Sequence, residues 1–290
     1  MVGGGNNPLV TVTLPARLLG EADRAAIQEV LDREPIAGAQ VAEIVSVRGI
    51  DWWRSGARMF GYGSRPGKLD AVCWFGTNLI PVGADDRAVA AFAAAGRAEG
   101  RRCSSIVGPA DAVLGLWSRL RSWWGPARQV REDQPVMVTD RPPPVAPDPK
   151  VRLVRPDELD ILFPAACAMY TEEVGVPPAT RPDGNPYKRR VAELIAKRRA
   201  YARIENGKVL FKADLAVVTP HTVQIQGVWV PPDRRGQGLA TGGMAAVVTD
   251  ALARGFTNLS LYVNSHNIAA RRVYERCGFR QVGSFATVLF

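Results

Sequence analysis

The chain of 290 residues is poor in the residue types that metal sites and disulfide scaffolds require. It has only two histidines, His221 and His266, and we expect both to be polar loop residues. Its four cysteines stand far apart, without the paired spacing of a zinc site or the density of a disulfide-rich domain; they are Cys73, Cys103, Cys167 and Cys277. We therefore expect no bound metal and reduced thiols.

Long apolar runs are also missing. The longest of them, such as residues 88–95, fall short of the roughly 20 residues that a helix needs to cross a bilayer, so we expect no membrane segment. The first residues lack a basic stretch followed by an apolar one, which argues against a secretory signal. We expect residues 1–14 to be a mobile tail and the protein to be cytoplasmic.

The net charge of +9 resides mainly in the second half of the chain. The first 150 residues include 18 basic and 16 acidic residues, and the remainder includes 19 and 12. A positive field attracts anionic ligands, among them nucleic acids. Because no zinc finger or RNA-binding signature accompanies the charges, we do not expect a nucleic-acid partner. We interpret the basic cluster at residues 188–199 as a solvated helix face.

A glycine-rich segment at residues 228–248 is the strongest signal of a binding site. It predicts an apolar strand, a short turn, a loop and a helix, with the sequences VWV, PPDRR, GQG and LATGGMAAVV. Gly236 and Gly238 lack the Cβ atoms that would keep a phosphate away from the backbone N–H groups. A helix that starts near Leu239 adds the unpaired amides of its first turn and the positive end of its dipole. We predict a pyrophosphate site here.

The spacing of this segment distinguishes between kinds of pyrophosphate site. A dinucleotide fold uses G-x-G-x-x-G followed by an acidic residue about 20 positions on, and a nucleoside triphosphatase needs a lysine and a hydroxyl residue after its second glycine. The chain has neither pattern. Arg235, Gly238 and Ala240 instead match R/Q-x-x-G-x-G/A, the signature of the GNAT superfamily of acyl-CoA N-acyltransferases, which this segment therefore resembles.

A second segment, residues 259–283, strengthens the resemblance. Alternating apolar residues at its start predict a strand with one buried face, and a helix that ends at a glycine should follow. The second cofactor segment of the GNAT family is N-x-x-A-x-x-x-Y-x-x-x-G-F. Its places are filled here by Asn267, Ala270, Tyr274, Gly278 and Phe279. Residues 151–290 are thus similar to a GNAT acetyltransferase domain.

The resemblance implies that acetyl-CoA is the co-substrate and that an amine is the acceptor. Unpaired main-chain groups of Val228, Trp229 and Val230 would pair with the pantetheine arm of the cofactor. The Asn267 side chain would hydrogen-bond the same arm, near Ala270. The pyrophosphate would be held by the loop and the first helical turn, that is by Arg235, Gly236, Gln237, Gly238, Leu239, Ala240 and Thr241.

The resemblance also implies that Tyr274 is the general acid. A phenol with a pKa of about 10 is protonated at neutral pH and can give its proton to the departing thiolate; alternatively, Tyr274 only packs on the sheet. Many family members carry a glutamate on the fourth strand, whereas residues 223–228 contain no carboxylate. The candidates for the general base are Glu172, Glu173 and Asp214, and proton removal through water is equally open. The two glutamates could instead form a solvated helix end.

The predicted elements indicate a mixed-sheet α/β fold in two domains. A proline-rich linker at residues 139–150 would separate an N-terminal domain at 15–138 from the GNAT acetyltransferase domain at 151–290. In the second domain, Asp157 is a reasonable helix N-cap. The Asn-Gly pair at residues 206–207 predicts a tight hairpin between two strands.

The N-terminal domain repeats the order of the second domain: helices, a strand meander, a helix at residues 86–99, a strand and a further helix. We therefore expect two GNAT-like domains in tandem, although an unrelated α/β domain is the alternative. The first copy should be degenerate, because no R-x-x-G-x-G/A loop precedes its long helix and Trp117 replaces Tyr274. The tryptophans of this half are expected to pack in the core or between domains; they are Trp52, Trp53, Trp74, Trp117, Trp123 and Trp124.

The favoured function is the transfer of an acetyl group from acetyl-CoA to a primary amine, by an enzyme that is a monomer or a homodimer. The alternative is a non-catalytic acyl-CoA-binding sensor or interaction module, which the missing carboxylate on the fourth strand favours. The sequence does not identify the acceptor, because acceptor loops such as residues 172–185 vary between GNAT subgroups.

Overall fold

The computed structural model describes residues 15–65, 67–180 and 184–290. These residues form two compact units. The N-terminal unit contains residues 15–34, 44–132 and 286–290, and the C-terminal unit contains residues 35–43, 133–180 and 184–285. The tail predicted at residues 1–14 lies outside the described residues.

Within the described residues, the sheet of the C-terminal unit has the strand order β6-β11-β10-β9-β8-β7. Strand β10 runs parallel to β11, whereas the other neighbouring strands pair antiparallel. A mixed sheet of this kind is the predicted fold class. The strands are β6 (Gln129–Thr139), β7 (Arg152–Leu153), β8 (Ala200–Glu205), β9 (Lys208–Val218), β10 (Val223–Trp229) and β11 (Leu259–Tyr262).

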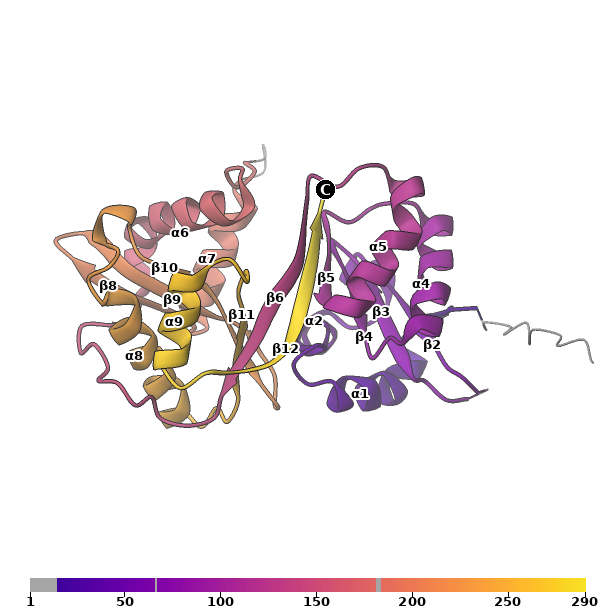
Figure 1. The fold of residues 1–290 in the computed structure, drawn as a ribbon, viewed down its shortest axis with the longest axis horizontal. Coiled ribbons are helices and arrows are strands. Elements are labelled where there is room, and N and C mark those ends of the chain that lie inside the picture. Colours follow the sequence, from indigo (N-terminus) through magenta and orange to yellow (C-terminus); the bar gives the residue numbers. More distant parts are fainter. Residues whose placement is uncertain (1–14, 66, 181–183) are drawn as a thin grey trace, which may run out of the picture. The chain divides into compact units, whose positions relative to one another are not determined.

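Helices pack on both faces of this sheet; they are α6 (Leu159–Val174), α7 (Pro186–Ala196), α8 (Leu239–Ala253) and α9 (Ile268–Arg276). Helices α6 and α7 cover one face, and α8 and α9 cover the other (Figure 1). Two core layers result, because successive side chains of a strand point to opposite faces. On β8, for example, Ala200 and Ala202 pack in the layer of α6 and α7, and Tyr201 packs in the layer of α8.

Two local predictions for the C-terminal unit had different outcomes. Asn206 and Gly207 have φ angles of 50° and 70° and join β8 to β9, which confirms the predicted hairpin. The prediction that Asp157 is an N-cap was wrong, because this residue lies inside the 3₁₀ turn η2 (Pro156–Glu158), whose N-cap is Arg155. The fixed φ of proline favours the first position of a helix, so the turn starts one residue before Asp157.

In the N-terminal unit, the described strands have the order β1-β2-β3-β4-β5, and the last residues of β12 (Arg280–Leu289) lie beside β5. Strands β4 and β5 are parallel, and the pairs from β1 to β4 are antiparallel. The other strands are β1 (Arg17–Leu19), β2 (Arg58–Tyr62), β3 (Ala71–Phe75), β4 (Asn78–Val82) and β5 (Ser105–Pro109). The helices of this half of the chain are η1 (Glu21–Asp23), α1 (Arg24–Arg33), α2 (Ala39–Arg48), α3 (Trp52–Ser55), α4 (Asp86–Glu99) and α5 (Ala110–Trp124).

The two units share one order of elements. In each, helices follow a first strand, and then come three antiparallel strands, a long helix, a parallel strand and a further helix. In each repeat, residues of the last strand belong to the other unit. Strand β6, which follows α5 in sequence, pairs with β11 of the C-terminal unit, whereas residues 286–289 of β12, which follows α9, lie in the N-terminal unit. The sequence predicted the repeat but not this exchange.

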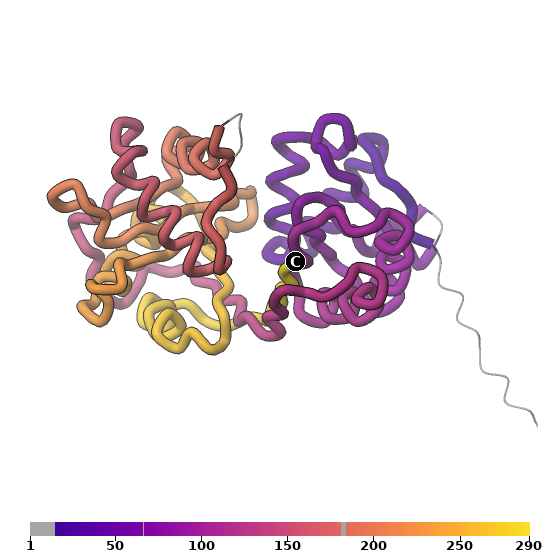
Figure 2. Tube along the Cα trace, turned by 90° about the horizontal axis from the view of Figure 1, so that it is seen from above, coloured from indigo at the N-terminus to yellow at the C-terminus, as the bar shows by residue number. Residues whose placement is uncertain are grey.

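The end of the chain is built into the N-terminal unit (Figure 2). The backbone N–H of Phe290 donates to the Ser104 carbonyl at 3.0 Å, and the N–H of Arg128 donates to the Leu289 carbonyl at 2.7 Å. Ala286 belongs to the core of this unit, together with residues of α4 and α5. The N-terminal unit is therefore completed by residues that are the last in the sequence.

The compact units differ from the predicted domain bounds of 15–138 and 151–290. Residues 133–150, which include the predicted linker, belong to the C-terminal unit. There, the N–H of Asp148 donates to the Gly242 carbonyl of α8 at 2.9 Å, and its carboxylate accepts from Arg203 of β8 at 2.8 Å. The proline-rich segment thus packs on the sheet and on α8.

The tryptophans of the N-terminal unit divide between core and surface. Trp74 and Trp124 are buried, as expected, but Trp52, Trp53 and Trp123 are 58%, 66% and 69% exposed. The packing prediction was therefore wrong for these three side chains, which lie on the short helix α3 and at the end of α5. Among the described helices, none combines the length and apolar character needed to cross a membrane.

Candidate active site

The glycine-rich segment joins β10 to α8 through the 3₁₀ turn η3 (Pro232–Arg234). Gly236 and Gly238 have φ angles of 76° and 80°, a backbone conformation that glycine adopts without strain. A Cβ atom at either position would meet no other atom within 4 Å, so the space in front of the loop is open. The loop therefore presents bare backbone to this space.

Backbone donors line this loop and the first turn of α8. The N–H of Gly242 donates to the Gly238 carbonyl at 3.1 Å and is the first N–H of α8 to take part in a backbone hydrogen bond. Within the described residues, the N–H groups of residues 236–241 have no partner. The first turn of α8 also contains no acidic residue. Unpaired amides at the positive end of a helix dipole favour a bound anion such as a diphosphate.

Strands β10 and β11 separate towards the end of β10 that leads into this loop. They pair only at Val223 with Leu259 and at Gln224 with Ser260, although β10 continues to Trp229. A pocket of about 860 Å³ opens where they part. It is lined by these residues of the predicted cofactor set: Val228, Trp229, Val230, Arg235, Gly236, Gly238, Leu239, Ala240, Thr241, Asn267 and Ala270. The side chain of the remaining member, Gln237, is not part of the lining.

The Asn267 side chain and the Val230 carbonyl already have hydrogen-bond partners. The Oδ1 atom of Asn267 accepts from the Ala270 N–H at 3.1 Å and so caps α9, which leaves the Nδ2 group to face a ligand. The Val230 carbonyl accepts from Arg235 Nε at 3.1 Å. A pantetheine arm would therefore meet the donor group of Asn267 and the edge of β10 that is not paired with β11, near Val228.

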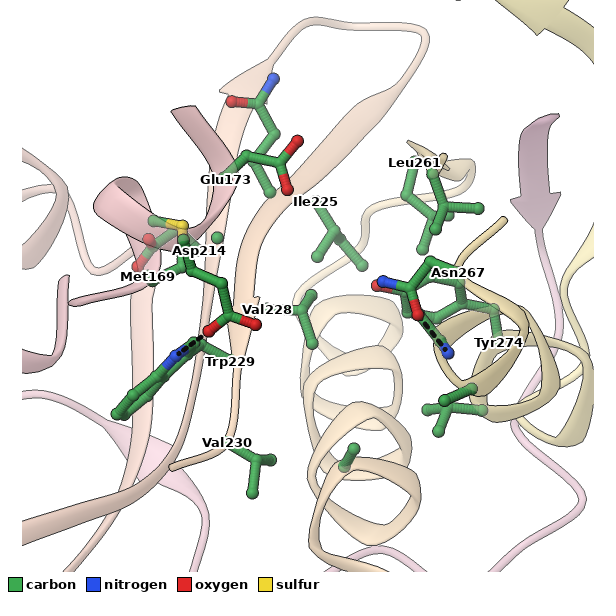
Figure 3. A pocket seen from close by; sticks show the side chains of 18 of the residues that line it. Met169, Glu173, Asp214, Ile225, Val228, Trp229, Val230, Leu261, Asn267 and Tyr274 are labelled. Carbon is green, nitrogen blue, oxygen red and sulfur yellow. Dashed lines mark hydrogen bonds between the residues drawn. The ribbon is translucent and has the colours of Figure 1, made fainter. Parts of the chain in front are cut away.

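Tyr274 lies on α9, on the same side of the pocket as Asn267 (Figure 3). The residue is only 7% exposed and its ring packs against Phe279 at a centroid distance of 6.0 Å. Burial raises the pKa of the Tyr274 hydroxyl above its ordinary value, and the charge of Glu173 adds to this rise. The ring thus packs against its neighbours, and the residue also lines the pocket in which the predicted general acid would act.

Two of the three candidate bases are tied to cations. Glu172 at the end of α6 accepts from Arg235 at 2.7 Å and from Trp229 Nε1 at 3.2 Å. The hydrogen bond from Arg235 lowers the pKa of this carboxyl, which makes it a weaker base than an ordinary glutamate. Asp214 on β9 is buried and accepts from the Lys212 ammonium at 2.7 Å.

Glu173, the third candidate base, is the one whose charge acts on Tyr274. It lies across the pocket from Tyr274 (Figure 3), and its negative charge is one cause of the raised pKa of the Tyr274 hydroxyl. These two side chains are therefore within electrostatic reach of each other and line one cavity. This arrangement places an acceptor of protons and a donor of protons on opposite walls.

The structure adds two residues that the sequence reading missed. Gln134 of β6 is 2% exposed, lines the pocket and donates through Nε2 to Asn264 Oδ1 at 2.9 Å. Lys212 of β9 is 1% exposed and holds Asp214. A signal for each exists, since both are polar residues within apolar strand sequences. Gln134, however, lies before the predicted GNAT domain at residues 151–290, and no motif marks Lys212 within its strand.

The remaining predictions concern metal ligands. His221 and His266 are exposed, and neither lines the pocket. In the described part of the chain, no three His, Cys, Asp or Glu side chains come together as a metal site would require. The pocket lining includes main-chain donors, arginines, carboxylates and the phenols of Tyr170, Tyr187, Tyr262 and Tyr274.

A splayed pair of parallel strands, an anion-binding loop at a helix start and a buried tyrosine define an acyl-CoA N-acyltransferase. Residues 167–279 match the Acetyltransferase (GNAT) family. Residues 57–162 match a domain of unknown function, DUF4081. No curated protein matches the chain.

Solved structures show the same fold over nearly the whole chain. A GCN5-related N-acetyltransferase from Sphaerobacter thermophilus is 19% identical, with 94% of this chain and 95% of that chain covered and a TM-score of 0.57. A GNAT-family acetyltransferase from Colwellia psychrerythraea is 12% identical, with 96% and 100% covered and a TM-score of 0.56. A Drosophila protein is 13% identical, with 95% and 98% covered and a TM-score of 0.59. At these identities the likeness concerns the fold alone.

Proposed function

We propose that the protein transfers an acetyl group from acetyl-CoA to a primary amine by direct attack. One observation supports this proposal most: a single pocket is lined by Gly236, Gly238 and the first turn of α8, and also by Tyr274 and Glu173. A diphosphate bound at one end would place the thioester of the same molecule near the phenol.

The cofactor would be held mainly by the main chain. The diphosphate would accept hydrogen bonds from the amides of residues 236–241, and the pantetheine arm would run along the free edge of β10 past Val228 and Trp229. The Asn267 Nδ2 group would donate to the same arm. No metal is needed for these contacts, because every donor is an N–H group.

The chemistry would follow from this placement. The lone pair of a neutral amine attacks the thioester carbonyl carbon, a C–N bond forms, and the negative charge moves to the carbonyl oxygen. When the tetrahedral intermediate collapses, the C–S bond breaks and the Tyr274 hydroxyl gives its proton to the departing thiolate. The nitrogen loses one proton, so the products are an amide and the free thiol of coenzyme A.

Glu173 is the proposed acceptor of the amine proton, directly or through a water molecule. Its place on the pocket wall across from Tyr274 supports this choice. Glu173 also faces the phenol across the pocket, so the proton that it takes up can return to the Tyr274 phenolate at the end of the cycle. The acceptor amine would enter from the side of α6 and α7.

The test is release of free thiol from acetyl-CoA with a panel of primary amines, in which each product is identified by mass spectrometry. We expect thiol release that depends on one class of amine and an equal amount of the acetylated amine. Calorimetry with coenzyme A is the parallel measurement. Absence of any binding would contradict the proposal.

A non-catalytic acyl-CoA sensor is the second candidate, since β10 carries Gln224 and Gln226 where a carboxylate could stand and two nearby carboxylates are paired. Binding of acetyl-CoA without turnover on any amine would support it. Turnover with even one amine would remove it.

A further inference from the structure

A buried lysine contacts the main chain of Gly227, a residue that lines the pocket. The Lys212 ammonium donates to Asp214 Oδ2 at 2.7 Å and to the Gly227 carbonyl oxygen at 2.8 Å. Lys212 is 1% exposed, so both contacts lie in a medium of low dielectric constant. A buried cation is costly unless it is paired, and Asp214 supplies that pair.

Gly227 lies in a bulge of β10. The register runs from Gln226 opposite Asp214 to Trp229 opposite Lys212, so three steps along β10 correspond to two steps along β9. Gly227 has a φ of 64°, and a Cβ atom there would lie 2.7 Å from the Asp214 carboxylate and 2.8 Å from the Lys212 ammonium. Only glycine fits above this ion pair.

The peptide group between Gly227 and Val228 therefore has a fixed orientation. Its carbonyl points at the Lys212 ammonium, and in a trans peptide the N–H points the opposite way. This N–H belongs to Val228, which lines the pocket beside Ile225 (Figure 3). At this point β10 is no longer paired with β11, because the last pair between them is Gln224 with Ser260.

We propose that Lys212 is a positioning residue for acetyl transfer: it fixes and polarises the Gly227–Val228 peptide so that the Val228 N–H donates to the thioester carbonyl oxygen. This inference rests on the proposed function. The negative charge that reaches this oxygen when the amine attacks is met by an N–H whose carbonyl already faces a cation. A dipole that is fixed before the reaction needs no reorganisation during it. No proton moves at this peptide, and the charge leaves the oxygen when the C–S bond breaks.

Asp214 supports the same orientation of the peptide. Its carboxylate neutralises Lys212 and packs against the bulge, so its contacts support the orientation of the peptide rather than proton removal from the amine. Removing Lys212 alone would leave a buried carboxylate without its cation. A clean test must therefore change both side chains together.

The test compares the wild-type protein with the double variant Lys212→Gln/Asp214→Asn. The glutamine amide can still donate to a carbonyl, so this variant removes the charge and retains polar partners at the bulge. The probe is acetyl-CoA labelled with ¹³C at the acetyl carbonyl, and infrared difference spectroscopy measures the carbonyl stretch of the bound molecule. We expect a lowered frequency in the wild type relative to free acetyl-CoA, and a smaller lowering in the double variant.

The kinetic readout accompanies the spectrum. Loss of a whole oxyanion donor lowers kcat by about 10²- to 10³-fold, and because the Val228 N–H remains we expect a smaller loss, of about tenfold. The dissociation constant of acetyl-CoA should stay within about twofold. Arg203→Met is the matched control: it removes a cation that pairs with Asp148 on the neighbouring strand β8, outside the pocket, and should change neither frequency nor kcat.

The outcomes separate the two proposals. If the double variant binds acetyl-CoA with an unchanged carbonyl frequency, the role of Lys212 is refuted, whatever happens to kcat. If the frequency changes but no amine is acetylated by the wild type, the peptide acts on the carbonyl as inferred and the transferase proposal fails. A thermal melt of each variant shows whether it is folded. Should the double variant not fold, Lys212→Arg, which keeps the charge and moves the donor, must shift the frequency.

Discussion

At the scale of single residues, Tyr274 offers a direct test of the proposed acid. Tyr274→Phe removes only the hydroxyl, and because general acid catalysis contributes about 10²- to 10⁴-fold, we expect kcat to fall by about 100-fold or more. The ring packing against Phe279 is kept, so the dissociation constant of acetyl-CoA should change by less than about twofold. Steady-state kinetics and calorimetry measure the two quantities.

The control for this prediction is Tyr201→Phe. Tyr201 is also buried in the C-terminal unit, and its hydroxyl donates to Asp250 at 2.6 Å, but it does not line the pocket. This variant should lose stability and keep its kcat. Full activity in Tyr274→Phe would exclude the phenol from the reaction.

A second residue, Glu158, predicts a pH dependence of stability. Its carboxylate is 5% exposed, accepts two hydrogen bonds from Arg152 at 2.7 Å and 2.8 Å, and accepts a third from the Arg155 N–H at 2.9 Å. The Arg152 contact, followed by the other charged donors, lowers the pKa of Glu158 to about 2. In an unfolded chain this pKa is about 4.3.

The sign of the effect follows from these two values. Because the pKa is lower in the folded state, Glu158 contributes stability that is fully present above about pH 4.3 and is lost as the pH falls towards 2. We expect Glu158→Gln to lower the free energy of unfolding at pH 7 by about 1–3 kcal/mol and to flatten its dependence on pH between about 5 and 2. Urea unfolding over this pH range measures both, with the exposed Asp157→Asn as the control.

At the scale of elements, the loop before α8 should depend on its glycines. Gly238→Ala places a methyl group in the space that the diphosphate would occupy, at a residue with a φ of 80°. We expect the dissociation constant of acetyl-CoA to rise at least about tenfold, because the methyl group blocks approach to the unpaired amides. Calorimetry with acetyl-CoA measures the change.

Gly255, just after α8, provides the matched control. It has a φ of 87° and, like Gly238, nothing within 4 Å of an added Cβ atom. Gly255→Ala should therefore carry a similar backbone strain, of about 1 kcal/mol, and leave cofactor affinity unchanged. Equal effects of both substitutions on affinity would mean that the loop is not the diphosphate site.

The sequence was informative about elements wherever local chemistry decides them. The Asn-Gly pair sets a hairpin, and helices α4 and α8 begin at the predicted residues 86 and 239, because turn residues and helix starts depend on neighbours in sequence. The exchange of β6 and β12 could not be read in this way. Several strands are apolar enough to serve as the last partner, and the choice between them is made by long-range pairing.

The same distinction holds for the site. The cofactor loop and the Tyr274 segment are contiguous motifs, so their residues could be found from spacing. Lys212 and Gln134 act through contacts with Gly227 and Asn264, which lie 15 and 130 positions away in the sequence. No spacing rule joins such residues, and only the fold brings each of them into contact with a residue that lines the pocket.

The last residues of β12 should stabilise the N-terminal unit. Phe290 stacks on Trp117 at 5.6 Å and on Trp124 at 6.0 Å, and Val288 is fully buried in the same core. A chain that ends at Phe285 should lose at least about 3 kcal/mol of stability in this unit, since removal of one buried aromatic side chain already costs that much. Tryptophan fluorescence during urea unfolding reports on Trp117 and Trp124.

A milder variant completes this prediction. Phe290→Leu keeps the backbone pairing of the chain end and removes only the ring, so its loss should be smaller than that of the truncation. An unfolding midpoint of the truncated chain equal to that of the wild type would show that the chain end contributes nothing.

At the scale of the whole molecule, two units share one order of elements but differ at the start of the long helix. In the C-terminal unit, α8 begins after Gly238 with unpaired amides and no acidic residue. In the N-terminal unit, α4 begins after Asp85, whose side chain accepts from the Ala88 N–H at 2.8 Å, and Asp86 adds a second carboxylate. Negative charge at this helix end repels a diphosphate, so we predict that the first copy of the fold lacks the cofactor site.

This difference predicts the stoichiometry of cofactor binding. Calorimetry with acetyl-CoA should give one bound molecule for each chain, and Gly238→Ala should weaken this single site without leaving a second one behind. A ligand that binds only the folded state adds about 2.7 kcal/mol of stability at 100 times its dissociation constant, so saturating acetyl-CoA should also raise the melting temperature of the wild type by several degrees. Two molecules bound per chain, or a rise in melting temperature that survives in Gly238→Ala at the same cofactor concentration, would assign a working cofactor site to the N-terminal unit.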